Sequence, residues 1–200
     1  MSEANPRVAD YPVDRRFLDR WSPRAFTGES VPDDALRTMF EAARWAPSSY
    51  NSQPWRFVYA KRDTPDWEKF LNLLSQTNRT WAKNAGVLTI VVSQVAMETP
   101  PGSGKFTPSH SHSFDTGAAW GYLALEAQRL GFAAHAMAGF DIPRAAVELN
   151  VPDGHRVEAA IAIGRRGDKS ILPEALAARE IPNARKSQDH FVYEGGFPPT

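Results

Sequence analysis

The twelve residues from Ala46 to Phe57, APSSYNSQPWRF, constrain the fold more than any other stretch of the chain. Pro47 ends the helix expected before it, because proline lacks a backbone N–H and its ring clashes with the preceding turn. Pro54 leads into Arg56–Ala60, an aromatic and β-branched run that is typical of a strand. The polar side chains between them both donate and accept hydrogen bonds. They suit a flat heteroaromatic ring or a sugar-alcohol chain, although plain connecting loops have the same composition.

Composition excludes several classes of protein. The 200 residues suit one domain, with hydrophobic residues at 42% and charged residues at 23%. Lys plus Arg and Asp plus Glu both number 23, and this balance argues against a nucleic-acid-binding protein. The lack of cysteine rules out disulfides, thiolate nucleophiles and iron–sulfur clusters. The N-terminus has no apolar core like that of a secretory signal, and the longest apolar stretch, Ala85 to Val92, is too short to span a membrane. We therefore expect one cytoplasmic domain, residues 1–200, with no membrane or nucleic-acid contact.

Four segments have the composition of strands, and helical patterns fill the intervals between them. The strands are expected at Arg56–Ala60, Val87–Ser93, Phe132–Met137 and Val157–Ile163. Apolar residues at helical spacing predict helices around 36–46, 67–74 and 119–130. This irregular alternation predicts a central sheet with helices on both faces.

Caps and irregular segments complete the outline. Ser113 or Asp115 is expected to cap the helix around 119–130, and Asp141 the helix that follows the third strand. Pro100–Ser113, rich in Gly, Pro and Ser, predicts a mobile surface loop. The tail Arg179–Thr200 carries aromatic residues after the last core element, so a partner subunit is the natural cover for them.

Arg20, Ser22 and Arg24 form a candidate anion site. Two guanidiniums with a hydroxyl between them can hold a phosphate bidentately, although a basic turn exposed to solvent would have the same sequence pattern. Other motifs are absent: there is no G-x-G-x-x-G, no P-loop and no G-x-S-x-G. His110 and His112 are too few for a metal site, so none is expected.

Two further positions have the chemistry of a ligand site. Asn78, at the end of a helical stretch, carries an amide that can pair with the imide edge of a ring, or it can cap the helix. Ala138 and Gly139 follow a strand, where small residues let a backbone N–H approach a ligand, as in many ordinary turns.

The string A-P-S-S-x-N-x-Q-P-W-x-F resembles the helix–loop–strand signature of the nitroreductase family of flavin enzymes. Further matching segments follow in the expected order: Arg20–Phe26, Asn78–Lys83, Met137–Asp141, and a weaker one from Leu172 to Phe197. The resemblance implies an α+β fold with a central mixed, mostly antiparallel sheet and helices on both faces. It also implies a homodimer, in which residues 179–200 form an extended tail around the partner.

The resemblance also implies flavin mononucleotide (FMN) as cofactor. Arg20 and Arg185 are then expected to bind the phosphate, and Trp21 and Ser22 to lie beside the cofactor. The resemblance places Arg24 at the pyrimidine edge, where a fixed cation would stabilise the negative charge that reduction leaves on the ring.

Other family positions surround the flavin ring. The resemblance places Asn78 at the imide edge and the main chain of Ala138 and Gly139 near N5. The loop residues Pro47, Ser48, Ser49 and Asn51 are expected to reach the flavin of the opposite subunit. Some relatives carry a lysine where this chain has Trp81, so the resemblance does not extend that polar contact to this chain.

The implied activity is hydride transfer from NADH or NADPH, through flavin N5, to an electron-poor small molecule such as a nitroaromatic or a quinone. The flavin carries this chemistry, so no side-chain acid or base is required. Two alternatives stay open on the same fold: a non-catalytic FMN storage protein covered by the 100–113 loop, and a specialised dehalogenase or flavin-fragmenting enzyme. The acceptor and the nicotinamide preference are not encoded in any recognisable motif.

Overall fold

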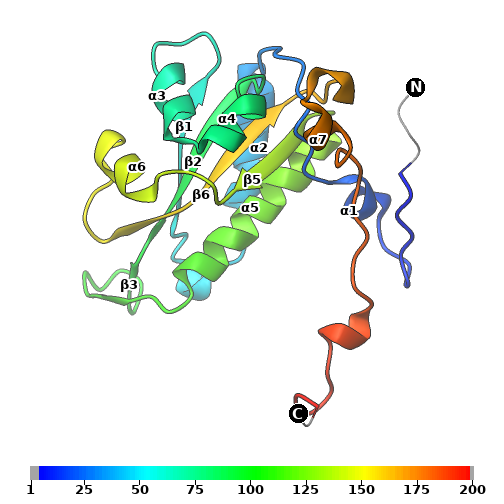
Figure 1. Ribbon diagram of the computed structural model, residues 1–200. Helices are drawn as coiled ribbons and strands as arrows, with labels where there is room; N and C mark the ends of the chain where they lie inside the picture. The colour runs from blue at the N-terminus through cyan, green and yellow to red at the C-terminus, as the bar shows by residue number, and fades with distance from the viewer. Residues whose placement is uncertain (1–4, 199–200) are drawn as a thin grey trace.

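A four-stranded antiparallel sheet organises residues 5–198, the part of the chain that this computed structural model describes (Figure 1). Its order is β1 (Trp55–Lys61), β2 (Val87–Gln94), β6 (His155–Gly164) and β5 (Ala133–Met137). All four expected strands are confirmed, and no end differs from the expectation by more than two residues. Each pairing between neighbours is antiparallel, so the mixed sheet that we expected is wrong for the described residues.

Helices cover both faces of the sheet, as expected. On one face lie α2 (Asp33–Arg44) and α5 (His112–Arg129), and on the other lie α3 (Trp67–Leu73), α4 (Gln76–Ala82) and α6 (Ile142–Glu148). Side chains of β2 alternate between these layers, because successive residues of a strand point to opposite faces. Val87 and Val91 join the core under α2 and α5, whereas Leu88 and Ile90 join the core under α3 and α4.

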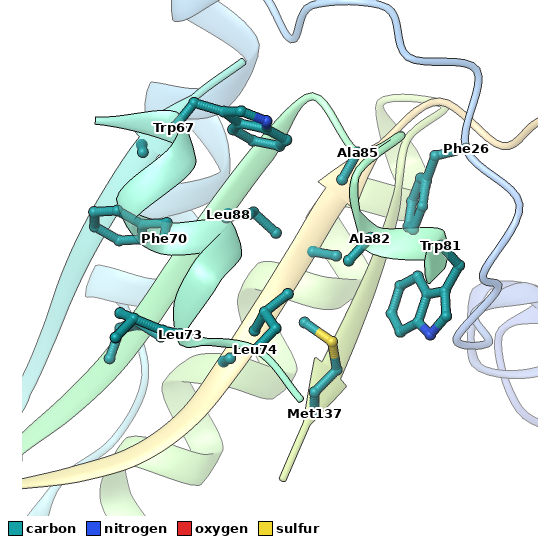
Figure 2. Packing of buried hydrophobic residues seen from close by; sticks show 14 of the residues in the cluster. Phe26, Trp67, Phe70, Leu73, Leu74, Trp81, Ala82, Ala85, Leu88 and Met137 are labelled. Carbon is teal, nitrogen blue, oxygen red and sulfur yellow. The ribbon is translucent and has the colours of Figure 1, made fainter. Parts of the chain in front are cut away.

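The core beneath α3 and α4 is rich in aromatic side chains (Figure 2). Trp67 and Phe70 of α3 lie over the strands, and Trp81 of α4 stacks on Phe26 with ring centroids 6.2 Å apart. Trp81 is therefore a core residue here, 1% exposed.

Three helix boundaries differ from the expectations. α5 begins at His112 after Ser111, one turn earlier than expected, and Asp115 is buried inside it. The helical stretch from residue 67 is broken in two, since Leu74 is extended and bridges to Phe140. Ser75 then caps α4, with its side chain accepting from the N–H of Asn78. Asp141 caps α6 as expected.

The loop expected at Pro100–Ser113 is partly ordered by a hairpin. β3 (Ala96–Glu98) pairs with β4 (Phe106–Pro108), and the turn between them holds residues 99–105. The chain then enters α5 directly, so the loop ends at Ser111. Phe106 is 62% exposed on this hairpin.

The N-terminal segment before α1 lies close to the start of the tail after α7, and the rest of the tail extends away from it (Figure 1). α1 (Arg15–Asp19) follows an extended N-terminal segment, and η2 (Lys169–Ile171) and α7 (Glu174–Ala177) follow the sheet. After α7 the tail extends away from the rest of the molecule, through η3 (Gln188–His190). Its side chains Phe191 and Phe197 are 62% and 88% exposed. None of the helices within residues 5–198 is long and apolar enough to cross a membrane.

Candidate functional site

A cavity of about 640 Å³ lies between the segment after α1 and the start of the tail. It brings together Arg20, Trp21, Ser22, Arg24 and Arg185, five residues that the sequence predicted for one site. Its lining also includes residues that the sequence analysis did not assign to a site, among them the titratable side chains of Arg7, His135 and Arg179. We call this space the arginine cavity. The guanidiniums of Arg7, Arg20, Arg24, Arg179 and Arg185 make it strongly cationic.

Glu180 of the tail fixes the position of the Arg24 backbone. Its side chain is 3% exposed, and Oε1 accepts hydrogen bonds from the backbone N–H of Arg24 at 2.6 Å and of Ala25 at 2.8 Å. Oε2 lies 4.0 Å from Arg24 Nη1. The carboxylate thus ties the first residues of the tail to the segment after α1. A lone glutamate in a polar tail gives no sequence signal for such a role.

Arg7 joins both walls of the arginine cavity. Its Nη1 donates to the carbonyl oxygens of Leu18 at 2.9 Å and Arg20 at 2.8 Å, and its Nε donates to that of Asn183 at 2.7 Å. Burial lowers the pKa of Arg20, and the charges of Arg7 and Arg185 lower it further. Within residues 5–198, no carboxylate forms an ion pair with Arg7, Arg20 or Arg185. Such a group of uncompensated cations favours the binding of an anion.

His135 is a neutral group among these cations. Its Nδ1 lies 2.8 Å from the carbonyl oxygen of Pro23, which can only accept, so Nδ1 carries the proton and Nε2 is an acceptor. Burial lowers the pKa of His135 to about 4, with smaller contributions from Arg24 and Arg20. The ring also packs on Trp81, with centroids 4.7 Å apart. The imidazole therefore carries an acceptor nitrogen among the guanidinium donors of the lining.

Asn78 and Gly139 form a second group, which does not line the arginine cavity. Asn78 Nδ2 donates to the carbonyl oxygen of Gly139 at 2.9 Å. Asn78 lies in the first turn of α4, so the helix-cap interpretation at a C-terminus is wrong. A Cβ at position 139 would lie 2.7 Å from Asn78 Nδ2, so the glycine makes room for this side chain. Ala138 and Gly139 are both exposed.

The loop after α2 forms a third group. Ser49 N–H donates to Asp115 Oδ2 at 3.1 Å, and Gln53 N–H donates to Ser48 Oγ at 3.0 Å. Asn51 and Gln53 have φ angles of 52° and 48°, a conformation that costs free energy outside glycine and often marks functional loops. Pro47 and Asn51 are exposed.

This loop and the arginine cavity lie toward opposite ends of α5. Asp115, which holds the loop, is in the first turn of α5, whereas Arg16 of α1 interacts with Glu126 near the other end. Asp115 and Glu126 are eleven positions apart along the helix, about 16 Å at 1.5 Å per residue. Within one chain, the Pro47–Asn51 loop therefore lies apart from the arginine cavity.

A Ser–His–Glu cluster elsewhere is not a hydrolytic site. Ser93 Oγ lies 2.8 Å from His112 Nδ1 and donates to Glu158 Oε1 at 2.6 Å, and Ser113 Oγ donates to the same oxygen at 2.7 Å. Ser93 is fully buried, so no substrate can reach its hydroxyl. The network instead anchors the start of α5 to β2 and β6. His112 is thus a helix residue, not the loop residue that we expected.

The fold and the cavity together define an α+β domain with a pocket suited to an anionic small molecule. The chain belongs to the nitroreductase family, whose sequence model matches residues 18–165. This match confirms the family that the motifs indicated.

Individual relatives agree with this membership. A protein of Streptomyces coelicolor named "Putative NADH dehydrogenase/NAD(P)H nitroreductase" is 30% identical over 150 residues, 68% of this chain and 74% of that protein. An uncharacterized 15.4 kDa protein of Mycolicibacterium smegmatis is 42% identical over 82 residues, 40% of this chain. The matched part spans only 55% of that relative's length.

Solved structures share the fold. A crystal structure described as an oxidoreductase containing FMN superposes with a TM-score of 0.93 at 49% identity, covering 100% of both chains. The complex of FMN with a nitroreductase-type protein of Desulfovibrio desulfuricans superposes with a TM-score of 0.69 at 27% identity, covering 95% of this chain and 100% of the other.

Proposed function

We propose that this protein is an FMN-dependent oxidoreductase that uses NADH or NADPH to reduce electron-poor small molecules such as nitroaromatics or quinones. When bound, FMN would supply hydride transfer between the nicotinamide and the acceptor. The protein's task is then to bind the cofactor, orient it and tune its charge.

The arginine cavity is the observation that carries this proposal. Its volume of about 640 Å³ falls in the usual range for cofactor sites, roughly 300–1,000 Å³. Its uncompensated guanidiniums match the dianionic phosphate of FMN, because arginine donates bidentately to phosphate oxygens. The names of the relatives, which mention NAD(P)H and FMN, support the same chemistry.

We assign Arg20 and Arg185 to the phosphate, and Trp21 and Ser22 to the wall beside the cofactor. Arg24 takes a different role, because Glu180 holds its backbone and its side chain is 24% exposed. Placed at the pyrimidine edge, it stabilises the negative charge of the reduced ring. Asn78 uses one amide hydrogen on Gly139, which leaves its other hydrogen and its oxygen for the imide edge.

The active site in this proposal needs a homodimer. The Pro47–Asn51 loop, with Ser48 and Ser49, cannot reach the cavity of its own chain, since they lie toward opposite ends of α5. A second copy with its α5 antiparallel to the first would bring the loop of each chain to the other's cavity. The outer face of α5 is apolar, with Phe114 82% and Tyr122 43% exposed, and the aromatic tail is also uncovered. Light scattering should therefore give a dimer, and a monomer that retains stoichiometric FMN would contradict the shared site.

The β3–β4 hairpin is placed to select acceptors in this dimer. It leads into the same end of α5 that holds the Pro47–Asn51 loop, and Phe106 is exposed on it. Phe106→Ala should change the relative rates with large and small quinones while FMN affinity stays within about twofold. An equal loss of flavin would show that the hairpin is structural instead.

The test of function begins with the purified protein. Its absorption spectrum with FMN should show bound flavin, which NADH or NADPH bleaches under anaerobic conditions and a nitroaromatic or quinone restores. Absence of FMN binding contradicts the whole proposal. Flavin that binds tightly and is never reduced by NAD(P)H supports the storage alternative.

A further inference from the structure

Arg7 occupies a wall of the arginine cavity although it lies outside the segment matched to the family, residues 18–165. The cavity therefore contains a cation that the family motifs did not indicate. Carbonyl oxygens of Leu18, Arg20 and Asn183 accept three hydrogen bonds from its Nε and Nη1. These bonds hold the guanidinium plane in one orientation, which lowers the entropy cost of a further contact.

One end of this guanidinium stays available. Within residues 5–198, Arg7 Nη2 has no hydrogen-bond partner, and no carboxylate lies within ion-pair distance of the side chain. An arginine has five N–H donors, so the two hydrogens on Nη2 can reach a ligand without breaking the three existing bonds.

The positive charges around Arg7 favour the binding of an anion. Burial lowers the pKa of Arg7 and of Arg20. The charge of Arg185 lowers the pKa of both further, and the charge of Arg7 that of Arg20, so these three guanidiniums lie close enough to act on one another. Bringing like charges together is unfavourable unless a counterion joins them. A phosphate dianion placed among the three would turn this repulsion into attraction.

We propose that Arg7 is a third phosphate-binding arginine beside Arg20 and Arg185, and that it makes the site selective for FMN over riboflavin, which lacks the phosphate. The inference rests on the proposed function, since it assumes that the arginine cavity holds the flavin phosphate. Arg7 also links the N-terminal segment to the tail at Asn183, so phosphate binding would join both ends of the described chain around the cofactor.

The experiment compares FMN and riboflavin binding by flavin fluorescence in the wild-type protein, in Arg7→Gln and in Arg7→Lys. A hydrogen bond to a charged group is worth about 1.5–3 kcal/mol, so Arg7→Gln should weaken FMN binding roughly tenfold or more. Riboflavin affinity should stay within about twofold, and added salt should shrink the difference. Arg7→Lys keeps the charge and should recover part of the FMN affinity. Arg37→Gln, which removes an exposed cation of α2, is the matched control.

The ratio of the FMN and riboflavin dissociation constants decides the outcome. A ratio that is unchanged in Arg7→Gln, with both ligands weakened equally, overturns the assignment and leaves Arg7 as a structural clasp. An equal change in Arg37→Gln also overturns it, since any surface cation would then suffice. A ratio of the FMN to the riboflavin dissociation constant that rises roughly tenfold in Arg7→Gln supports the assignment. If Arg7→Lys does not lower this ratio again, the planar fork of arginine is needed as well as its charge. Wild-type protein that binds neither flavin contradicts the proposed function itself.

Discussion

Replacing Glu180 should lower the free energy of unfolding strongly, although the residue lies in the tail. Its Oε1 accepts two backbone hydrogen bonds, at 2.6 and 2.8 Å, and the side chain is 3% exposed. Hydrogen bonds to a charged acceptor contribute about 1.5–3 kcal/mol each, so Glu180→Ala should lower the free energy of unfolding by about 4 kcal/mol. The contact with Arg24 at 4.0 Å adds little, because Arg24 is partly solvated. Glu180→Gln keeps an acceptor oxygen but makes both bonds neutral, roughly half as strong, so about 2 kcal/mol is expected.

Urea denaturation followed by circular dichroism measures these differences. Glu174→Ala, an exposed glutamate in the neighbouring α7, is the control and should change the unfolding free energy by less than about 0.5–1 kcal/mol. The expected order of stability is wild type, Gln and then Ala. If Glu180→Ala falls within error of the control, or if Gln and Ala are equally destabilised, the carboxylate does not hold the tail in the way described.

Three further predictions address the cofactor, the backbone and pH. Arg24→Ala should lower the midpoint potential of bound FMN and slow its reduction roughly a hundredfold, whereas Arg20→Ala should mainly weaken FMN binding; an unchanged potential in redox titration would reverse the two roles. Gly86→Ala should cost about 3 kcal/mol in denaturation, because the new Cβ would lie 2.5 Å from the backbone oxygen of Glu29; wild-type stability would contradict this packing. Burial lowers the pKa of His135 in the folded protein to about 4, below the unfolded value of 6.5. The unfolded state therefore binds a proton first as the pH falls below 6.5, and the free energy of unfolding of flavin-free protein should drop by about 3 kcal/mol by pH 4. His135→Asn should remove this loss, and identical pH profiles would show that the imidazole is not buried as neutral.

The secondary structure and the family could be predicted from the sequence, since both are local properties of the chain. Aromatic and β-branched composition located the strands of the sheet, and apolar residues at helical spacing located the helices. Pro47 and the polar residues that follow it gave a continuous motif with little ambiguity. Helix boundaries differ from the prediction where a tertiary contact overrides local preference. The break before α4 is an example, because Leu74 bridges to Phe140 far along the chain.

The site required the tertiary structure. Arg20 and Ser22 are close in sequence, but Arg7, His135 and Glu180 reach them only when the N-terminal segment, β5 and the tail come together. The bonds that achieve this run to backbone carbonyls and N–H groups, which every residue carries, so they leave no pattern of residue types along the chain. The same holds for Gly139, whose lack of a side chain makes room for Asn78. The sequence by itself determined which elements form and which family they belong to. Only the packing of distant segments decided which charges share one cavity, because electrostatic and steric contacts depend on separation in space rather than along the chain.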